Sequence, residues 1–287
     1  MNTEKFAEGI TLLRQPIMPL VSMVQFLYMT GSFTTVTEVI NEFPEPIETD
    51  RTVYEHPRSL LLGYQDILAG FAQVKAGTFP VSKVVDEENI PVDSFSAGVA
   101  VILQQLLTRE LEKINSVLCG PCGCTWCCVG PEKTMAQEYF EIPLGSGEPE
   151  LFAVRRCDNA ASRRSLPEDD EELQWQGRPF YRVTGPTLFH WKKGWSLILP
   201  TGSACPNLHD TGQCRVYDRR PTVCRRPQIF PYMVEPLAGV DGGTPAMRIR
   251  RSLLAVVDCP YVRELQEEIA DYASAGELHL VLKQNKQ

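Results

Sequence analysis

The apolar positions in the first part of the chain recur with the spacing of helices. In residues 60–74 and 96–118, apolar side chains return every three or four residues, the period of an α-helix with one buried face. The apolar stretch 17–29 is interrupted by polar residues and falls short of the roughly 20 residues that a membrane helix needs. It predicts a buried helix. Residues 1–114 are therefore expected to form a mainly helical segment.

Beyond residue 119 the pattern changes to short apolar runs separated by Gly and Pro, which favours strands. These runs are residues 180–183, 188–191, 195–199 and 247–257. Residues 262–272 have the pattern of an amphipathic helix, and residues 158–178 contain PEDDEEL and little to bury, which predicts a solvated insertion. We expect an α+β fold, in which residues 115–287 form a small sheet with long cysteine loops and a C-terminal helix.

The length and net charge of the chain limit the cellular compartments and binding partners that we expect for it. The 287 residues, 43% of them hydrophobic, are enough for a substantial core. A net charge of -8 repels nucleic acid, and no basic patch offsets it. The first residues include Glu4 and Glu8 and lack the basic start of a secretory signal. The chain is therefore expected to be cytoplasmic, with neither a nucleic-acid nor a membrane partner.

The ten cysteines all lie between residues 119 and 259, and five of them fall within ten residues. This first group is Cys119, Cys122, Cys124, Cys127 and Cys128. Gly and Pro between the cysteines favour tight turns that direct several sulfurs at one metal. A reducing compartment and the strained ring of an adjacent pair disfavour disulfides, and burial alone explains single thiols but not five so close together.

Further cysteines follow on separate loops. Cys205, Cys214 and Cys224 form a second group that can converge on the same site, whereas Cys157 is isolated and is predicted not to be a ligand. Cys259 stands before a helix, whose dipole favours a thiolate, and we include it among the ligands. The predicted metal ligands are Cys119, Cys122, Cys127, Cys128, Cys205, Cys214, Cys224 and Cys259, and the place of Cys124 stays open.

Thiolates bring negative charge that an acidic protein must compensate locally. Five arginines lie within residues 215–226, around Cys214 and Cys224. Arginine stays protonated and donates through a planar fork, so it can support a thiolate site. Arg220 and Arg225 are the two that we expect to contact the metal site, and His209 is interpreted as a loop residue.

These motifs resemble a known family, the cysteine-cluster proteins with a zinc- or iron-chelating domain, which include the flagellin lysine N-methylase-like proteins. The resemblance covers about residues 115–265. Its first part is a CxxC followed by CC, and its second a CPxL segment. The third is the run from Cys214 through Arg220, Pro221, Cys224 and Arg225 to the Phe230–Pro231 pair. Cys124 is an additional thiol within the first gap.

The family implies a bound metal, and thiolates suit both iron-sulfur clusters and zinc. One CxxC with an adjacent CC differs from the paired knuckles of most zinc sites, so an iron-sulfur cluster is the preferred cofactor and zinc the alternative. We expect a metal-binding protein with a structural, redox or sensing role. The alternatives are a protein lysine N-methyltransferase, although no glycine-rich cofactor turn is present, and an interaction module with a protein partner or protein substrate.

Overall fold

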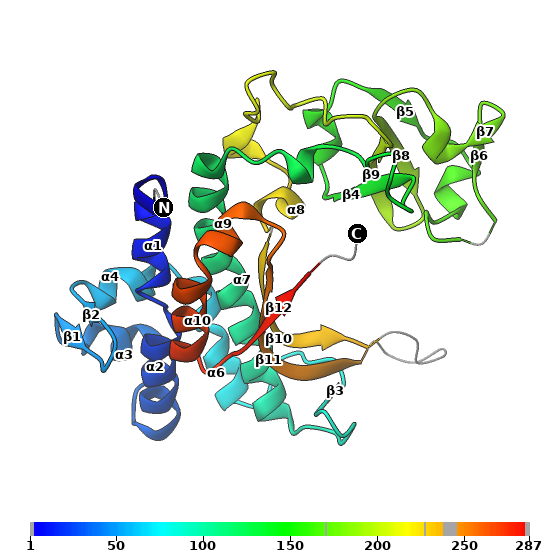
Figure 1. Cartoon of the computed structure of the whole chain (residues 1–287). Coiled ribbons are helices and arrows are strands. Elements are labelled where there is room, and N and C mark those ends of the chain that lie inside the picture. The colour runs from blue at the N-terminus through cyan, green and yellow to red at the C-terminus, as the bar shows by residue number, and fades with distance from the viewer. Residues whose placement is uncertain (1–2, 170, 227, 238–245, 285–287) are drawn as a thin grey trace. The chain divides into compact units, whose positions relative to one another are not determined.

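The computed structural model describes residues 3–169, 171–226, 228–237 and 246–284, and it has an α+β fold (Figure 1). The chain forms two compact units. Unit one contains residues up to 118 together with those from 228 onwards, and unit two contains residues 119–226. This division differs from the predicted boundary at residue 115, because the strands after residue 228 pair with a strand of the N-terminal segment.

Unit one contains most of the helices. They are η1 (Thr3–Phe6), α1 (Ala7–Leu13), α2 (Met18–Thr30), α3 (Val36–Asn41), α4 (Pro57–Leu62), α5 (Gln65–Leu68), α6 (Gly70–Lys75), α7 (Ser94–Cys122), α9 (Pro260–Glu264) and α10 (Gln266–Ala275). The predicted helices at 17–29 and 96–118 are confirmed as α2 and α7. The predicted helix at 60–74 is divided into α4, α5 and α6, with Gly63 ending the first of them.

A four-stranded sheet completes unit one. Its strands are β3 (Val84–Val85), β10 (Ile229–Pro236), β11 (Met247–Val256) and β12 (His279–Lys283). β11 is central, antiparallel to β10 and parallel to both β12 and β3. A separate hairpin joins β1 (Ile47–Glu48) to β2 (Val53–Tyr54). Two amide side chains of α7 bind the backbone of β10: Gln104 accepts from Met233 N at 2.7 Å, and Asn115 donates to Ile229 O at 2.9 Å.

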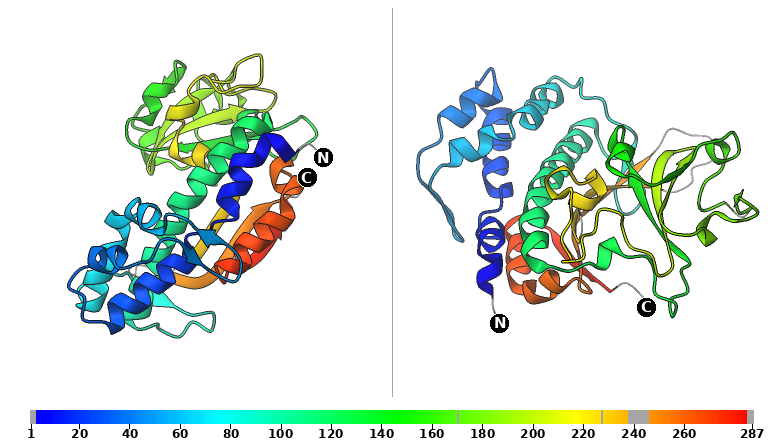
Figure 2. Two further views of the ribbon diagram at one scale, coloured as in Figure 1. Left: turned by 90° about the vertical axis from the view of Figure 1, so that its left-hand side faces the viewer. Right: turned by 90° about the horizontal axis from the view of Figure 1, so that it is seen from above.

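A buried carboxyl group lies where the helices of unit one meet. Glu110 of α7 is 7% exposed and accepts hydrogen bonds from the Tyr272 hydroxyl at 2.6 Å and from Ile17 N at 2.8 Å. It thus joins α7 to α10 and to the start of α2. Helix α10 also lies beside α1, as Figure 2 shows. Burial raises the pKa of Glu110 to about 7, because a charged carboxylate is poorly solvated there.

Unit two is built on a second four-stranded sheet with the order β4-β9-β8-β5. Its strands are β4 (Tyr139–Leu144), β5 (Arg155–Cys157), β8 (Thr187–Trp191) and β9 (Gly194–Pro200). The strands predicted at 188–191 and 195–199 are confirmed. One face carries an aromatic cluster in which Phe180 packs edge-on against Phe189 and Trp191. The strand expected at 180–183 is a 3-10 helix, η5 (Phe180–Arg182), that supplies this cluster.

Short elements connect and flank this sheet. They are η2 (Trp126–Cys128), η3 (Glu148–Leu151), η4 (Ser162–Arg164), β6 (Gln174–Trp175), β7 (Arg178–Pro179), η6 (Tyr217–Arg219) and α8 (Thr222–Arg225). The acidic insertion expected at 158–178 is only partly solvated. Its carboxylates Glu168, Asp169, Glu171 and Glu172 are exposed, but Leu173 and Ser162 are buried. Leu173 packs into the aromatic cluster, which explains why this acidic segment is folded.

One segment, Glu4–Thr30, is long and apolar enough to cross a membrane by length and composition. In the structure it is divided into η1, α1 and α2 rather than forming one uninterrupted helix. Helix α2 buries five residues and packs against α3 and α4. One side of α2 is therefore buried within unit one.

Candidate metal centre

The first cysteine pair lies at the end of α7 rather than in a free turn. Cys119 and Cys122 both belong to its last turn, with Pro121 between them. Gly123 then takes a positive φ of 65° and donates to Gly120 O at 3.3 Å, which ends the helix. Cys124 follows immediately, and its sulfur accepts a hydrogen bond from Trp126 N at 3.4 Å.

The adjacent pair Cys127–Cys128 lies beside the CPxL loop. Cys205 N donates to Cys128 O at 2.7 Å, and Gly130 N donates to Ser203 O at 2.8 Å. Between these two bonds, Val129 and Ala204 form an isolated antiparallel bridge. The two segments are almost eighty residues apart in the sequence, and this bridge sets their register. The CC motif and the CPxL motif are therefore parts of one local structure.

The CPxL segment forms a tight turn around its own sulfur. Leu208 N donates to Cys205 O at 2.9 Å, and burial raises the pKa of the Cys205 thiol while the backbone amides of Asn207 and Leu208 act to lower it. Leu208 also pairs with Cys214 in an isolated bridge, and Arg215 N donates to Asn207 O at 2.8 Å. The loop is thereby closed with Cys214 beside the turn. Amide donors directed at sulfur stabilise the negative charge of a thiolate ligand.

Cys224 is supplied by the short helix α8. The start of this helix is held by Glu148, which accepts from both the backbone amide and the hydroxyl of Thr222 at 2.8 Å. Cys224 and Cys205 pack against the same hydrophobic cluster on the sheet, which contains Leu197 and Leu199. The sheet thus supports both the CPxL turn and α8.

Electrostatic effects show which thiols lie close together. Burial, followed by the charges of neighbouring thiols, raises the pKa of Cys128 to about 12. The thiols that act on it are Cys205, Cys127, Cys224 and Cys214. The pKa of the Cys224 thiol is also raised to about 12, first by burial and then by the charge of Cys205. Cys127 and Cys214 raise it further, and the charge of Arg220 acts to lower it. Three separate segments therefore bring five thiols together.

Cys119, Cys122 and Cys124 form the remaining group. Burial raises the pKa of the Cys119 thiol, Arg220 opposes this through its charge and a hydrogen bond, and Cys122 and Cys124 raise it further. Arg220 itself is only 7% exposed. It is thus a buried cation next to thiols, and its role at a metal site stays a prediction.

Arg225 occupies a different environment. Its Nη2 donates to the Thr222 hydroxyl at 3.2 Å. Burial acts to raise the pKa of Glu148, but hydrogen bonds from Gly145 and Thr222, with the nearby Arg225, hold it below its usual value. Arg225 therefore stabilises the start of α8. Glu148 was not predicted, because nothing in the local sequence links it to Thr222, 74 residues away.

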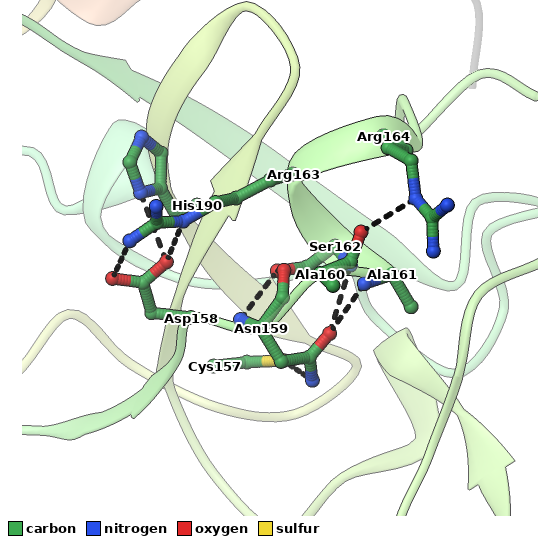
Figure 3. A network of polar contacts seen from close by, with 9 residues as sticks. All are labelled: Cys157, Asp158, Asn159, Ala160, Ala161, Ser162, Arg163, Arg164 and His190. Atoms are coloured by element: carbon green, nitrogen blue, oxygen red, sulfur yellow. Dashed lines mark hydrogen bonds and ion pairs between the residues drawn. The ribbon is translucent and has the colours of Figure 1, made fainter.

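The two outlying cysteines differ from the rest. Cys157 is 2% exposed at the end of β5, and its sulfur accepts from the Asn159 amide at 3.6 Å (Figure 3). The same network contains Asp158, whose pKa is lowered to about 2 by the hydrogen bond from Arg163 and also by His190. Cys259 is 7% exposed in unit one, at the N-cap of α9, and its assignment as a ligand stays a prediction.

None of the ten cysteines, all of which lie within the described ranges, forms a disulfide. Within the described ranges, no three His, Cys, Asp or Glu side chains converge tightly enough to hold a metal ion. Thiol sulfur is the donor type that suits soft metals, and a bound ion would require these side chains to move closer together. The other potential ligand, His209, accepts from Thr211 N at 3.2 Å within its own loop.

Comparison with known proteins identifies no relative. The chain matches no family model, no curated protein and no solved structure.

Proposed function

We propose that this chain is a cytoplasmic metal-binding protein that holds an iron-sulfur cluster, with zinc as the alternative, through cysteine thiolates. The observation that carries the proposal is the CPxL turn, in which Cys205 N donates to Cys128 O at 2.7 Å. The same turn lies against Cys128 and Cys214. Burial raises the pKa of the Cys205 thiol, so a bound cation is needed to favour the thiolate, which is the form that binds metal.

The burial of these thiols supports a bound cation. Without a positive charge nearby, burial and mutual repulsion favour the protonated thiols, as the raised pKa values of Cys128 and Cys224 show. A metal ion reverses this balance, because its charge offsets that of the thiolates as their protons are released. We infer a structural, redox or sensing role for this centre. The lysine N-methyltransferase alternative rests on the family resemblance alone.

The test is anaerobic purification of the full chain followed by elemental analysis for iron, zinc and acid-labile sulfide. Iron with a matching amount of sulfide is the expected result, and zinc without sulfide would support the alternative cofactor. A Cys157→Ser protein provides the matched control, since that thiol lies in the separate network of Figure 3. Protein that is fully folded yet contains neither metal would refute the proposal.

A further inference from the structure

The clustered thiols of unit two fall into two sets with separate structural supports. The first set consists of Cys127, Cys128, Cys205, Cys214 and Cys224, which the bridges beside the CPxL turn and the hydrophobic cluster under α8 bring together. The second set consists of Cys119, Cys122 and Cys124, which the end of α7 supplies within six residues. The five-thiol set thus joins segments that are far apart in the sequence, whereas the three thiols of the second set are close neighbours in the sequence.

Ligand counting shows why one centre does not use all of these thiols. A structural zinc ion takes four ligands, and an iron-sulfur cluster of the common types is held by four cysteines. The five-thiol set meets that number with one thiol to spare. The three thiols at the end of α7 and directly after it are therefore not needed at the same centre.

The three-thiol set has its own features of a metal site. Trp126 N donates to the Cys124 sulfur at 3.4 Å, an amide-to-sulfur bond outside the five-thiol set. The positive φ of Gly123 turns the chain between Cys122 and Cys124, so that the third thiol follows the helix end directly. Cys119, Cys122 and Cys124 are all partly accessible to solvent, which leaves a path for an ion to enter.

One arginine serves both sets. The Arg220 guanidinium donates a hydrogen bond to Cys119, and its charge also acts on Cys224 of the five-thiol set. A buried cation in this position offsets negative charge in whichever set is ionised. Its presence next to both sets permits thiolates to accumulate in each, in a chain whose net charge is already -8.

We propose that unit two contains two separate thiolate sites. The five-thiol set provides the main centre, and Cys119, Cys122 and Cys124 bind a second, divalent cation of the zinc type. Three protein ligands leave the fourth position of a tetrahedral ion for water or a small exogenous ligand. This inference rests on the proposed function, since it assumes that the thiols of unit two bind metal at all.

The experiment is a titration of the reduced, metal-free full chain with Co²⁺, monitored by its thiolate charge-transfer absorption. Wild type should bind about two equivalents, whereas Cys122→Ser and the triple variant Cys205→Ser/Cys214→Ser/Cys224→Ser, which keeps only two thiols of the five-thiol set, should each bind about one. Cys157→Ser is the matched control and should behave as wild type. Loss of all binding in both ligand variants would mean one shared site, and full binding in Cys122→Ser would mean that the three-thiol set is not a site. Either result overturns the inference while leaving the proposed function intact.

Alkylation followed by mass spectrometry provides a second measurement that needs no variant. At about one equivalent of Co²⁺, wild type should protect the cysteines of one set, and excess metal should protect both. Simultaneous protection of both sets would overturn the two-site inference. A wild-type chain that binds no Co²⁺ and protects no cysteine would refute the proposed function along with it.

Discussion

The guanidinium carbon of Arg220 lies 3.7 Å from the centre of the Tyr217 ring, and Arg220 Nε donates to Tyr217 O at 2.9 Å. The ring packs in turn against the end of α7, where a Cβ on Gly120 would lie only 3.0 Å from the Tyr217 hydroxyl oxygen. A cation held on an aromatic face by a further hydrogen bond has little rotational freedom. Tyr217 thus fixes the guanidinium that Cys119 contacts.

Replacing Arg220 should therefore weaken metal retention. Partners that support metal ligands typically contribute about 10 to 100-fold in affinity, so Arg220→Gln should lose metal to a chelator faster by a factor in this range. Arg220→Lys should rescue only partly, because it keeps the charge but not the planar fork. The measurement is a chelator competition, with the exposed neighbour replaced in Arg219→Gln as the control.

Arg225 provides a comparison within the same loop. Its hydrogen bond to Thr222 and its proximity to Glu148 stabilise α8, so we expect Arg225→Ala to release metal more readily than wild type but less readily than Arg220→Gln. Arg225→Lys should lie between Arg225→Ala and wild type in the same competition. Indistinguishable release curves for wild type and both Arg225 variants would mean that Arg225 does not support the site.

Cysteine replacements should separate ligands from packing residues. Cys224→Ser leaves the five-thiol set without a spare ligand and should lower the metal content of protein purified in the presence of a chelator, whereas Cys157→Ser should leave it unchanged. Both sulfurs have raised pKa values from burial, so burial alone does not distinguish the two variants. Equal metal content in the two proteins would contradict the assignment of Cys224.

Gly130 offers a test of the bridge between the CC and CPxL segments. A Cβ at this position would lie 2.2 Å from the backbone oxygen of Pro200, which cannot move independently of β9. Gly130→Ala should therefore destabilise unit two by about 1 to 3 kcal/mol, the usual cost of overpacking, and lower its metal content. At Gly276 an added Cβ meets neighbours no closer than 3.4 Å, so Gly276→Ala is the control. Denaturant unfolding should show a lower midpoint for Gly130→Ala alone.

Metal removal should affect the two units unequally. The cysteine loops of unit two contain little regular secondary structure. In zinc-finger peptides, metal binding to the ligands contributes about 10 to 16 kcal/mol of binding free energy. Chelated protein should thus be cleaved first within residues 119–226 when it is exposed to a protease, while unit one stays intact. Mass spectrometry of the fragments identifies the sites. Unchanged cleavage after complete metal removal would mean that unit two folds without metal.

Glu110 should make the stability of unit one depend on pH. Its pKa is about 7 in the folded chain against an ordinary value of 4.5, so between these values the folded state binds a proton that the unfolded state has lost. Stability should therefore decrease as the pH rises from about 4.5 to about 7, by at most about 3 kcal/mol. Glu110→Gln should remove this decrease. Thermal unfolding of wild type and Glu110→Gln at several pH values measures this effect. A difference in Tm between the two proteins that stays the same at every pH would contradict the raised pKa of Glu110.

The sequence predicted the long helices and the central strands because each of them has a clear apolar period. Helix α7 and strands β8, β9 and β11 coincide with runs that were recognised in advance. The 3-10 helix η5 was mistaken for a strand, since a short apolar run at residues 180–183 has no period of its own. Packing against the sheet decided its conformation.

The candidate site was predictable only in part. The CxxC, CC and CPxL motifs identify most of the thiols, because their spacing is local. The separation into two sets and the contacts of Glu148 and Tyr217 depend on segments far apart in the chain. The family run marked Arg220 and Arg225 equally, and only the structure shows that they have different partners.

The chain leaves unit one after residue 118 and returns to it at residue 228. On the ribosome, every cysteine except Cys259 is therefore synthesised before β10, β11 and β12, which make up most of the sheet of unit one. Domains usually fold in the order of their synthesis, but here the inserted unit is complete while the surrounding one still lacks its sheet. Under the proposed function, the thiols meet metal donors and oxidants while the chain is still nascent, and the supply of metal during translation should influence how much of this protein reaches its folded state.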